Sequence, residues 1–263
     1  MEDIYELSGL MQMYQATGAA GYGDRVLERI NRTGLPAGKN LLSGREAGAY
    51  LFALRQTGKQ EYRNAADLVF NRLVSGEEVI SETAMPFYAE YDTLFNKKAH
   101  YGEIAAFFER KEAWSGQEAA ALIDTIDRMS MEIYEYYRAL CDLFKQVVRQ
   151  EMLAEVQNTE VQTVEVQSME VQSMEVQSME VQSMEVQSAE AHLNNGRAWA
   201  GYAVLKACNM GILNREKYGE AGLRIWRRFE EQQEQEDGLG NMLKAQYLVF
   251  EKDREKWSVD MRG

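Results

Sequence analysis

The stretch IYELSGLMQMYQATG, residues 4–18, contains the pattern from which the fold is predicted. Its apolar residues follow the three- and four-residue spacing of an amphipathic helix: Ile4, Leu7, Leu10, Met11 and Tyr14. The pattern stops at Thr17-Gly18, and glycine commonly follows a helix end because it adopts positive φ at little cost. This stretch is therefore predicted to be one helix that ends at Thr17.

The same kind of ending recurs at a spacing of about forty residues. Leu54-Arg55-Gln56-Thr57-Gly58 ends a second apolar segment, and Leu94-Phe95-Asn96-Lys97-Lys98 ends a third. After each ending, a tyrosine opens a shorter amphipathic segment: Tyr22, Tyr62 and Tyr101. The chain is therefore predicted to be a series of helical hairpins.

Further helices are expected in the rest of the chain. The predicted segments are 119–129 with 134–152, then 198–210 ending at Gly211, then 214–226 beginning at Asn214, and finally 242–251. Strand patterns are almost absent, so the predicted fold class is all-α. Repeated hairpins either stack into an open solenoid or close into a toroid with inner and outer rings of helices, and periodicity alone does not distinguish the two.

A low-complexity insert interrupts the helical pattern at 155–190. The triplet Glu-Val-Gln begins there at seven positions with a period of five: 155, 160, 165, 170, 175, 180 and 185. The insert holds eight glutamates and no Lys, Arg or Asp, so it supplies eight of the thirteen net negative charges. On a helix, a five-residue period turns successive valines by about 140°, and no apolar stripe forms. We expect an acidic linker with low burial.

This insert divides a single predicted domain. Residues 1–154 are predicted to form its N-terminal helical hairpins, and residues 191–263 are predicted to complete it after the linker. Without the insert, the net charge of the remaining chain is −5 instead of −13. The strong acidity is therefore a property of the linker more than of the domain.

Composition limits the classes of partner. The chain has 263 residues, a net charge of −13 and two cysteines, Cys141 and Cys208. Acidic chains match nucleic-acid phosphates poorly, so nucleic-acid binding is not expected. No apolar run reaches the roughly 18 residues of a membrane span, and no secretory leader pattern opens the sequence, so no membrane partner is expected. Two cysteines are too few for a disulfide framework, which favours a reducing, cytoplasmic location.

No metal or cofactor motif stands out in the sequence. The two histidines, His100 and His192, lie in distant segments, so a shared metal site is not expected. The sequence contains neither a Gly-x-Gly-x-x-Gly pattern nor a Walker loop, so no nucleotide cofactor is expected. Arg224, Arg227 and Arg228 fit the polar face of an amphipathic helix.

Four stretches of the sequence resemble a known family. They are Asn40-Leu41-Leu42-Ser43-Gly44-Arg45, Ala84 through Asn96, Ala121 through Ile126, and Gly196 through Leu213. In this order they resemble segments of unsaturated rhamnogalacturonyl hydrolases, which belong with unsaturated glucuronyl hydrolases to the six-hairpin glycosidases (glycoside hydrolase families 105 and 88). The resemblance covers nearly the whole chain outside the insert. It implies an (α/α)6-type toroid of helical hairpins, incomplete here because Met1 begins about one helix late.

The resemblance also implies an activity. Members of this family hydrate the 4,5-unsaturated uronic acid at the end of pectin-derived oligosaccharides. An aspartic acid protonates the double bond and assists a water, a second aspartate helps, and the resulting hemiketal opens to release the sugar. This chemistry needs a carboxyl group that stays protonated near neutral pH and then acts as a base.

The catalytic positions of the family hold other residues in this chain. Lys39 and Val79 occupy the positions of the two aspartates. The family's Trp-x-Arg-Gly-Asn-Gly-Trp segment reduces to Trp114-Ser115-Gly116-Gln117, and Leu193-Asn194-Asn195-Gly196 stands where the family has Glu-x-Ser-Gly. We therefore expect a glycoside hydrolase scaffold with impaired activity, and whether the chain is an enzyme stays open at this point.

Five residues are the candidates for a site. Glu78 and Glu82 lie close to Val79 in the sequence and are substitute candidates for the lost acid; the alternative is that both are solvated acids of a loop and a helix start. Trp114 is the candidate aromatic for stacking on a sugar. The resemblance assigns substrate binding to Asn40 and Arg45 as well.

Three functions are compatible with these patterns. The first is a hydrolase that acts on an oligosaccharide with a terminal unsaturated uronic acid. The second is a non-catalytic saccharide-binding or eroded member of the same family. The third is a helical-repeat interaction protein that holds a peptide on its concave surface. A toroid that lacks a helix exposes an apolar edge, so either a homodimer or marginal stability is also expected.

Overall fold

The structure is a computed structural model that describes residues 5–32, 41–152, 195–232 and 237–260. Every regular element in these ranges is a helix, and none of the described residues forms a strand. The prediction of an all-α fold is therefore confirmed. The linker predicted at 155–190 lies outside the described residues.

Eleven α-helices make up the described part of the chain. They are α1 (Glu6–Thr17), α2 (Ala20–Arg32), α3 (Gly48–Thr57), α4 (Gln60–Ser75), α5 (Met85–Phe95), α6 (Tyr101–Glu109), α7 (Gly116–Arg128), α8 (Tyr134–Val147), a helix at 195–209, α12 (Arg215–Gln232) and α13 (Gly238–Asp260). A 3₁₀ turn, η1 (Glu82–Ala84), precedes α5, and a π-helical turn, η2 (Val148–Met152), continues α8.

The repeated helix endings are confirmed, and they follow from backbone conformation. Gly18 and Gly58, which end α1 and α3, have left-handed φ angles of 69° and 68°. The third ending has no glycine, and Lys97 and Lys98 adopt the left-handed region instead, with φ of 55° and 63°. The N–H of Lys98 donates to the carbonyl of Asp92 at 3.1 Å, which offsets part of the conformational cost.

The start of the last helix differs from the prediction. The apolar pattern places it at residue 242, but α13 begins at Gly238. Asp237 explains the difference, because its Oδ1 accepts the N–H of Gly240 at 2.6 Å and so caps the helix. Gly238 and Gly240, which resemble loop residues in the sequence, are therefore helical.

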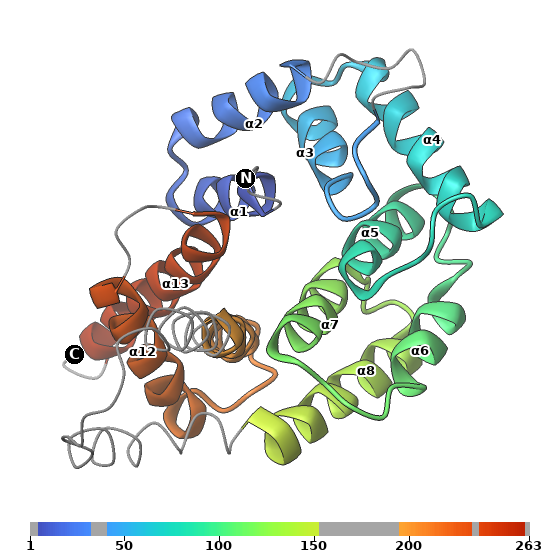
Figure 1. Ribbon diagram of the computed structural model, residues 1–263. Helices are drawn as coiled ribbons and strands as arrows, with labels where there is room; N and C mark the ends of the chain where they lie inside the picture. Colours follow the sequence, from blue (N-terminus) through green and yellow to red (C-terminus); the bar gives the residue numbers. More distant parts are fainter. Residues whose placement is uncertain (1–4, 33–40, 153–194, 233–236, 261–263) are drawn as a thin grey trace, which may run out of the picture.

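The helices are arranged around a common centre (Figure 1). α1, α3, α5, α7, the helix at 195–209 and α13 lie nearer to this centre, while α2, α4, α6, α8 and α12 lie outside them. α1 packs along α13, so the first and last helices of the described chain are neighbours. A glycine makes this approach close: a Cβ added at Gly9 would lie 2.5 Å from the carbonyl oxygen of Gly238.

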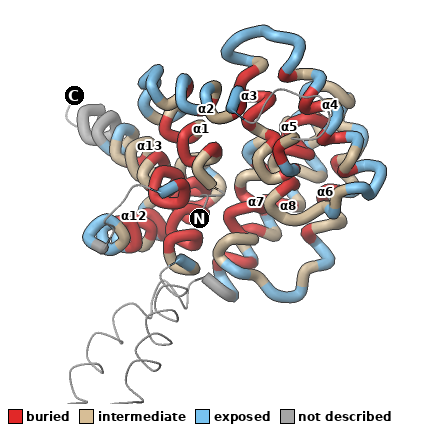
Figure 2. The backbone as a smooth tube through the Cα atoms, turned by 45° about the horizontal axis from the view of Figure 1, so that its top comes forward, coloured by how far each residue is buried: buried red, intermediate tan, exposed pale blue. Residues whose placement is uncertain are grey.

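The core consists of the helix faces that are turned toward other helices (Figure 2). Tyr62 and Tyr101, which open the outer helices of two hairpins, are 1% and 0% exposed, whereas Tyr22 is half-buried. The hydroxyl of Tyr101 accepts the N–H of Ser130 at 2.6 Å. These repeated tyrosines therefore pack each outer helix onto the inner ones.

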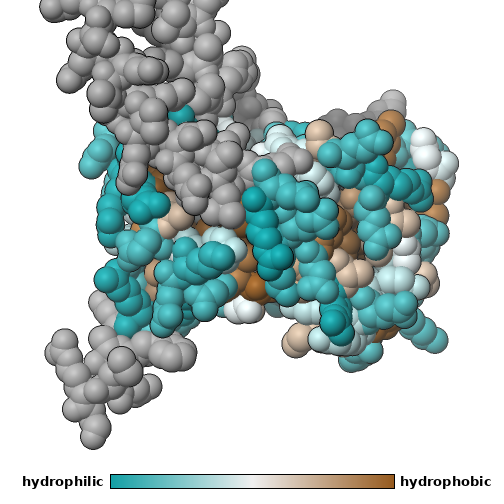
Figure 3. Space-filling view, turned by 90° about the horizontal axis from the view of Figure 1, so that it is seen from below, coloured by the Kyte–Doolittle hydropathy of each residue, from teal (hydrophilic) through white to brown (hydrophobic). Residues whose placement is uncertain are grey.

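The described surface does not present the predicted apolar edge beside α1. The exposed large apolar side chains lie on α4, on α5, in the loops before α5 and α8, and at the first residue of α8: Leu68, Val74, Val79, Leu94, Met131 and Tyr134. On the face seen in Figure 3, hydrophilic side chains dominate, and apolar ones appear mainly in the recesses between them. No described helix is both long enough and apolar enough to cross a bilayer. The homodimer remains a prediction.

Candidate functional site

A cavity lies between the inner helices, with residues of α1, α3, α5, α7 and α13 and of the helix at 195–209 in its lining. Its volume is about 780 Å³ when the part open to solvent is counted. Polar and aromatic side chains from these separate helices meet at this one hollow, which is where ligand sites of helical bundles commonly lie. The cavity is therefore the candidate functional site.

The charged residues of the lining are three arginines and two acids. They are Arg45, Arg55, Arg128, Glu90 and Asp124, which give the lining a formal net charge of +1. The whole chain has a net charge of −13. A positively charged cavity within an acidic protein favours an anionic ligand.

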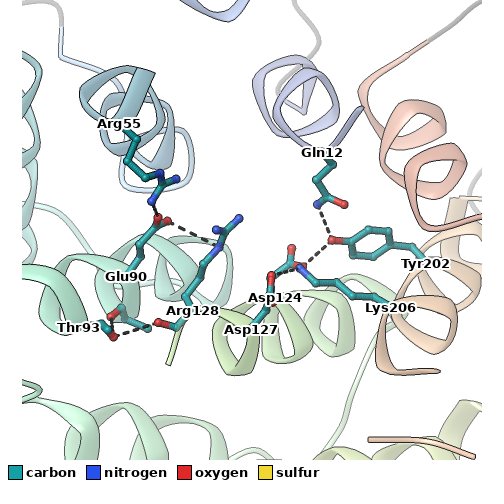
Figure 4. A network of polar contacts seen from close by, with 10 residues as sticks. Gln12, Arg55, Glu90, Thr93, Asp124, Asp127, Arg128, Tyr202 and Lys206 are labelled. Atoms are coloured by element: carbon teal, nitrogen blue, oxygen red, sulfur yellow. Dashed lines mark hydrogen bonds and ion pairs between the residues drawn. The ribbon is translucent and has the colours of Figure 1, made fainter. Parts of the chain in front are cut away.

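Glu90 connects two of these arginines on one side of the cavity (Figure 4). Arg55 of α3 donates to its Oε1, and the Nε of Arg128 of α7 lies 3.7 Å from its Oε2. Burial alone would lower the pKa of Arg128. The negative charges of Glu90 and of two aspartates on α7 outweigh this effect, so the pKa of Arg128 is raised overall. Thr93 fixes this end of α7 by donating to the carbonyl oxygen of Arg128 at 3.0 Å.

Asp124 is the centre of a second cluster on the opposite side (Figure 4). The hydroxyl of Tyr202 donates to Asp124 Oδ1 at 2.5 Å, and the Nζ of Lys206 lies 2.6 Å from the same oxygen. Lys206 also pairs with Asp127 at 2.9 Å, and Gln12 of α1 donates to the hydroxyl oxygen of Tyr202 at 2.5 Å. Two carboxylates and one amide thus surround the Tyr202 hydroxyl and the Lys206 ammonium group.

The pKa values in this cluster follow from burial and pairing. Burial and the adjacent Asp124 carboxylate raise the pKa of Tyr202 well above 10.0, so its hydroxyl stays protonated and donates. Burial alone would lower the pKa of Lys206 and raise that of Asp127. The charges of Asp124 and Asp127 outweigh burial and raise the pKa of Lys206, and the charges of Lys206 and Arg128 outweigh burial and lower the pKa of Asp127.

The polar network includes a residue from every inner helix. Gln246 of α13 donates to Oε1 of Gln12 at 2.8 Å, which extends the Asp124 cluster to the last helix. The two clusters come together on α7, which supplies both Asp124 and Arg128. The inner helices are therefore joined by polar contacts as well as by apolar packing.

Arg45 differs from the other two arginines of the cavity. Its Nε donates to Oγ1 of Thr83 at 3.0 Å, and its guanidinium carbon lies 5.5 Å from the ring centroid of Tyr5. No carboxylate among the described residues forms an ion pair with it. Arg45 is thus the arginine that has capacity left for an anionic ligand.

The two substitute acids lie outside the lining of this cavity. Glu78 accepts the N–H of Gly44 at 2.6 Å, and its other oxygen lies 3.1 Å from Nη2 of Arg72. Glu82 is 2.6 Å from the Nζ of Lys111. In this structure both acids connect loops and helix ends to one another.

The other predicted site residues are dispersed. Trp114 stacks on Phe108 with 6.1 Å between ring centroids and is not part of the cavity lining. Tyr5 and Trp199 supply aromatic surface to the cavity instead, with their centroids 4.7 Å apart. Asn40 lies outside the described residues, so Arg45 is the one predicted residue that the structure places in the lining.

Glu90 and Asp124 were not predicted as site residues, although a signal was present. Each is an acid within a largely apolar helical stretch, Met85–Tyr91 and Ala119–Ile126 respectively. A charged residue on such a stretch is costly to bury unless it is paired, so it indicates a polar cluster at that point. Which cations complete the cluster depends on helices that are distant in the sequence.

Fold and site together define an all-helical protein with a positively charged central cavity. The described residues contain no group of His, Cys, Asp and Glu that could hold a metal ion. Comparisons with known proteins found no family model, no curated protein and no solved structure that matches the chain. The functional conclusion therefore depends on the chemistry of the cavity and on the resemblance in the sequence.

Proposed function

We propose that the chain is an incomplete (α/α)6 toroid of the six-hairpin glycosidase type, whose central cavity binds a saccharide that carries a uronic acid. The packing of α1 against α13 supports a closed ring. An open arc, which a peptide-binding helical repeat would present, is less consistent with this contact. The alternation of inner and outer helices also supports the toroid.

The guanidinium of Arg45 carries the proposal. Carboxylates bind guanidinium groups through charge-assisted hydrogen bonds, and Arg45 meets the cavity without an acidic partner among the described residues. Tyr5 and Trp199 offer apolar surface beside it for the face of a sugar ring. The amide of Gln117, which donates to the hydroxyl of Tyr5, adds polar capacity for sugar hydroxyls.

Binding without turnover is the activity that this cavity supports best. Hydration of an unsaturated uronic acid requires a neutral carboxyl group that gives up a proton. Glu90 faces Arg55 and Arg128, and Asp124 faces Lys206. Both acids therefore have cationic neighbours, which favour a role as hydrogen-bond acceptors in this arrangement. The protein is therefore proposed to be a non-catalytic or strongly impaired member of its scaffold class.

A residual hydration activity is the second candidate function. It is favoured by one observation, that Glu90 and Asp124 both line a single cavity. Two carboxylates in one cavity are the minimum that the family's chemistry requires. In that case Asp124 or Glu90, and not Glu78 or Glu82, would replace the lost aspartates.

One experiment separates the two candidates. Oligosaccharides with a terminal unsaturated uronic acid, prepared with a pectin lyase, are titrated into the protein in a calorimeter, and the ultraviolet absorbance of the conjugated alkene is followed in parallel. The proposal predicts heat of binding with stable absorbance. Loss of absorbance in proportion to protein concentration supports the hydrolase instead, and absence of heat contradicts both.

The two cysteines support a cytoplasmic location as part of this proposal. Cys141 and Cys208 are buried and unpaired. Burial raises the pKa of both thiols, that of Cys208 to about 12, so neither is a reactive thiolate near neutral pH. Unpaired cysteines with no disulfide are typical of proteins in a reducing compartment.

A further inference from the structure

Asp124 presents one oxygen to the cavity while its other oxygen is fully engaged. Oδ1 accepts the hydroxyl of Tyr202 at 2.5 Å and the ammonium of Lys206 at 2.6 Å. No donor among the described residues bonds to Oδ2. The side chain is 17% exposed, and this residue lines the cavity (Figure 4). A carboxylate oxygen with open acceptor capacity therefore faces the ligand space.

We infer that Asp124 is a specificity residue of the cavity, and that its Oδ2 accepts a hydrogen bond from a hydroxyl group of the ligand. The inference rests on the proposed function and adds a second chemical requirement to it. The ligand must carry a hydroxyl group for Asp124 in addition to the anionic group for Arg45. Uronic acids satisfy both requirements, whereas simple carboxylates and neutral sugars each satisfy one.

The surroundings of Asp124 make it a selective acceptor. Tyr202 is fully buried, and Lys206 is 5% exposed, so both hold Oδ1 in a fixed position. A pre-oriented acceptor needs little rearrangement when a ligand binds. A ligand without the matching donor leaves Oδ2 desolvated and unpaired, which costs affinity.

Glu90, the other acid of the lining, lacks this property. Arg55 donates to its Oε1, and Arg128 lies 3.7 Å from its Oε2. Both oxygens of Glu90 thus have a cationic neighbour, whereas Asp124 has both of its donors on one oxygen. The hydroxyl acceptor is accordingly assigned to Asp124.

The variant Asp124→Asn tests the inference with a minimal change in shape. The asparagine keeps one oxygen for Tyr202 and Lys206, and it replaces the second oxygen by an NH₂ group that donates instead of accepting. Asp127→Asn is the matched control. It removes the same charge from the same lysine, but Asp127 is not part of the cavity lining.

Two probes are titrated into each protein: galacturonate, which has the carboxylate and the hydroxyls, and cyclohexanecarboxylate, which has the carboxylate alone. Asp124→Asn is expected to weaken galacturonate binding by about tenfold or more and to leave cyclohexanecarboxylate binding unchanged. Asp127→Asn is expected to change neither affinity by more than about threefold. Thermal melts establish that each variant is folded.

Each remaining outcome has a defined meaning. If the wild-type protein binds neither probe, the proposed function fails and the inference fails with it. If galacturonate binds but Asp124→Asn leaves its affinity unchanged, or weakens both probes equally, the inference alone is overturned. If Asp124→Asn does not fold, the affinities of the wild-type protein for the two probes test the inference instead. Equal affinity for galacturonate and cyclohexanecarboxylate would contradict a hydroxyl-accepting site.

Discussion

The hydroxyl of Tyr202 donates to the carboxylate of Asp124 at 2.5 Å, although 78 residues separate them in the chain. The same hydroxyl oxygen accepts the amide of Gln12, 190 residues away. One phenol group thus joins three inner helices at the wall of the cavity. Because its pKa is raised well above 10.0, this hydroxyl stays protonated and remains a donor near neutral pH.

Removing this hydroxyl is expected to destabilise the protein. In Tyr202→Phe, the buried amide of Gln12 and the Asp124 carboxylate each lose a partner, and the free energy of unfolding should fall by about 1–3 kcal/mol. Chemical denaturation followed by circular dichroism measures the change. Tyr136→Phe is the control, because the described residues contain no hydrogen-bond partner for the hydroxyl of Tyr136. Equal effects of the two variants would contradict a special role for Tyr202.

Gly9 is expected to be intolerant of even one added methyl group. Its added Cβ would lie 2.5 Å from the backbone oxygen of Gly238, and backbone atoms move aside less readily than side chains. Gly9→Ala should therefore reduce the free energy of unfolding by about 1–3 kcal/mol or more. Gly21→Ala in α2 has no atom within 4 Å and should be neutral or stabilising by up to about 1 kcal/mol. The opposite order in a thermal melt would argue against close packing of α1 on α13.

Acid is expected to weaken the start of α7. Burial alone raises the pKa of Glu118, but Lys111 and the capping bonds from Ser115 lower it below 4.5 overall. A carboxyl whose pKa is lowered on folding contributes stability above its unfolded pKa, and this contribution is lost as the pH falls through the folded value. Glu118→Gln should therefore be less stable than the wild-type protein at pH 7, and the gap should close below about pH 4.5.

The control for this pH dependence is Glu112→Gln. Glu112 is exposed and has no ion pair with the described residues, so its replacement should leave the pH profile of stability unchanged. Unfolding midpoints in urea between pH 3 and pH 7 give the comparison. A constant gap between Glu118→Gln and the wild-type protein over this range would show that the acid adds no pH-dependent stability.

Glu82→Gln is expected to lower the stability of the protein slightly and to leave its affinity for saccharides unchanged. Glu82 pairs with Lys111 outside the cavity lining, so the variant should lose at most about 1 kcal/mol of stability. Its affinity for uronic-acid saccharides, measured by calorimetry, should equal that of the wild-type protein. A loss of affinity by tenfold or more would show that Glu82 takes part in binding the saccharide.

Local patterns in the sequence determine most of the helices but not the site. The endings at Gly18, Gly58 and Lys98 are predictable because they depend on a few neighbouring residues. The cavity depends on which side chains of distant helices converge, and the sequence pattern holds no distance information. Trp114 illustrates the difference: its type fits sugar stacking, but tertiary packing places it against Phe108 instead.

Family resemblance was more informative about position than about chemistry. It placed Arg45 in a substrate-binding segment, and the structure places Arg45 in the cavity lining. It predicts the acid near Val79, which is 85% exposed in the structure. The resemblance assigns no role to Glu90 or Asp124, whose place in the lining depends on how distant helices pack together.

The most direct test of the central claim is the affinity of an unsaturated uronyl oligosaccharide for the wild-type protein and for Arg45→Gln. Arg227→Gln, an exposed position on α12, is the control for loss of one positive charge. The account predicts binding to the wild-type and Arg227→Gln proteins with equal affinity, and at least about tenfold weaker binding to Arg45→Gln. Equal affinity of all three proteins, or no binding by the wild-type protein, would contradict a uronic-acid site in the central cavity.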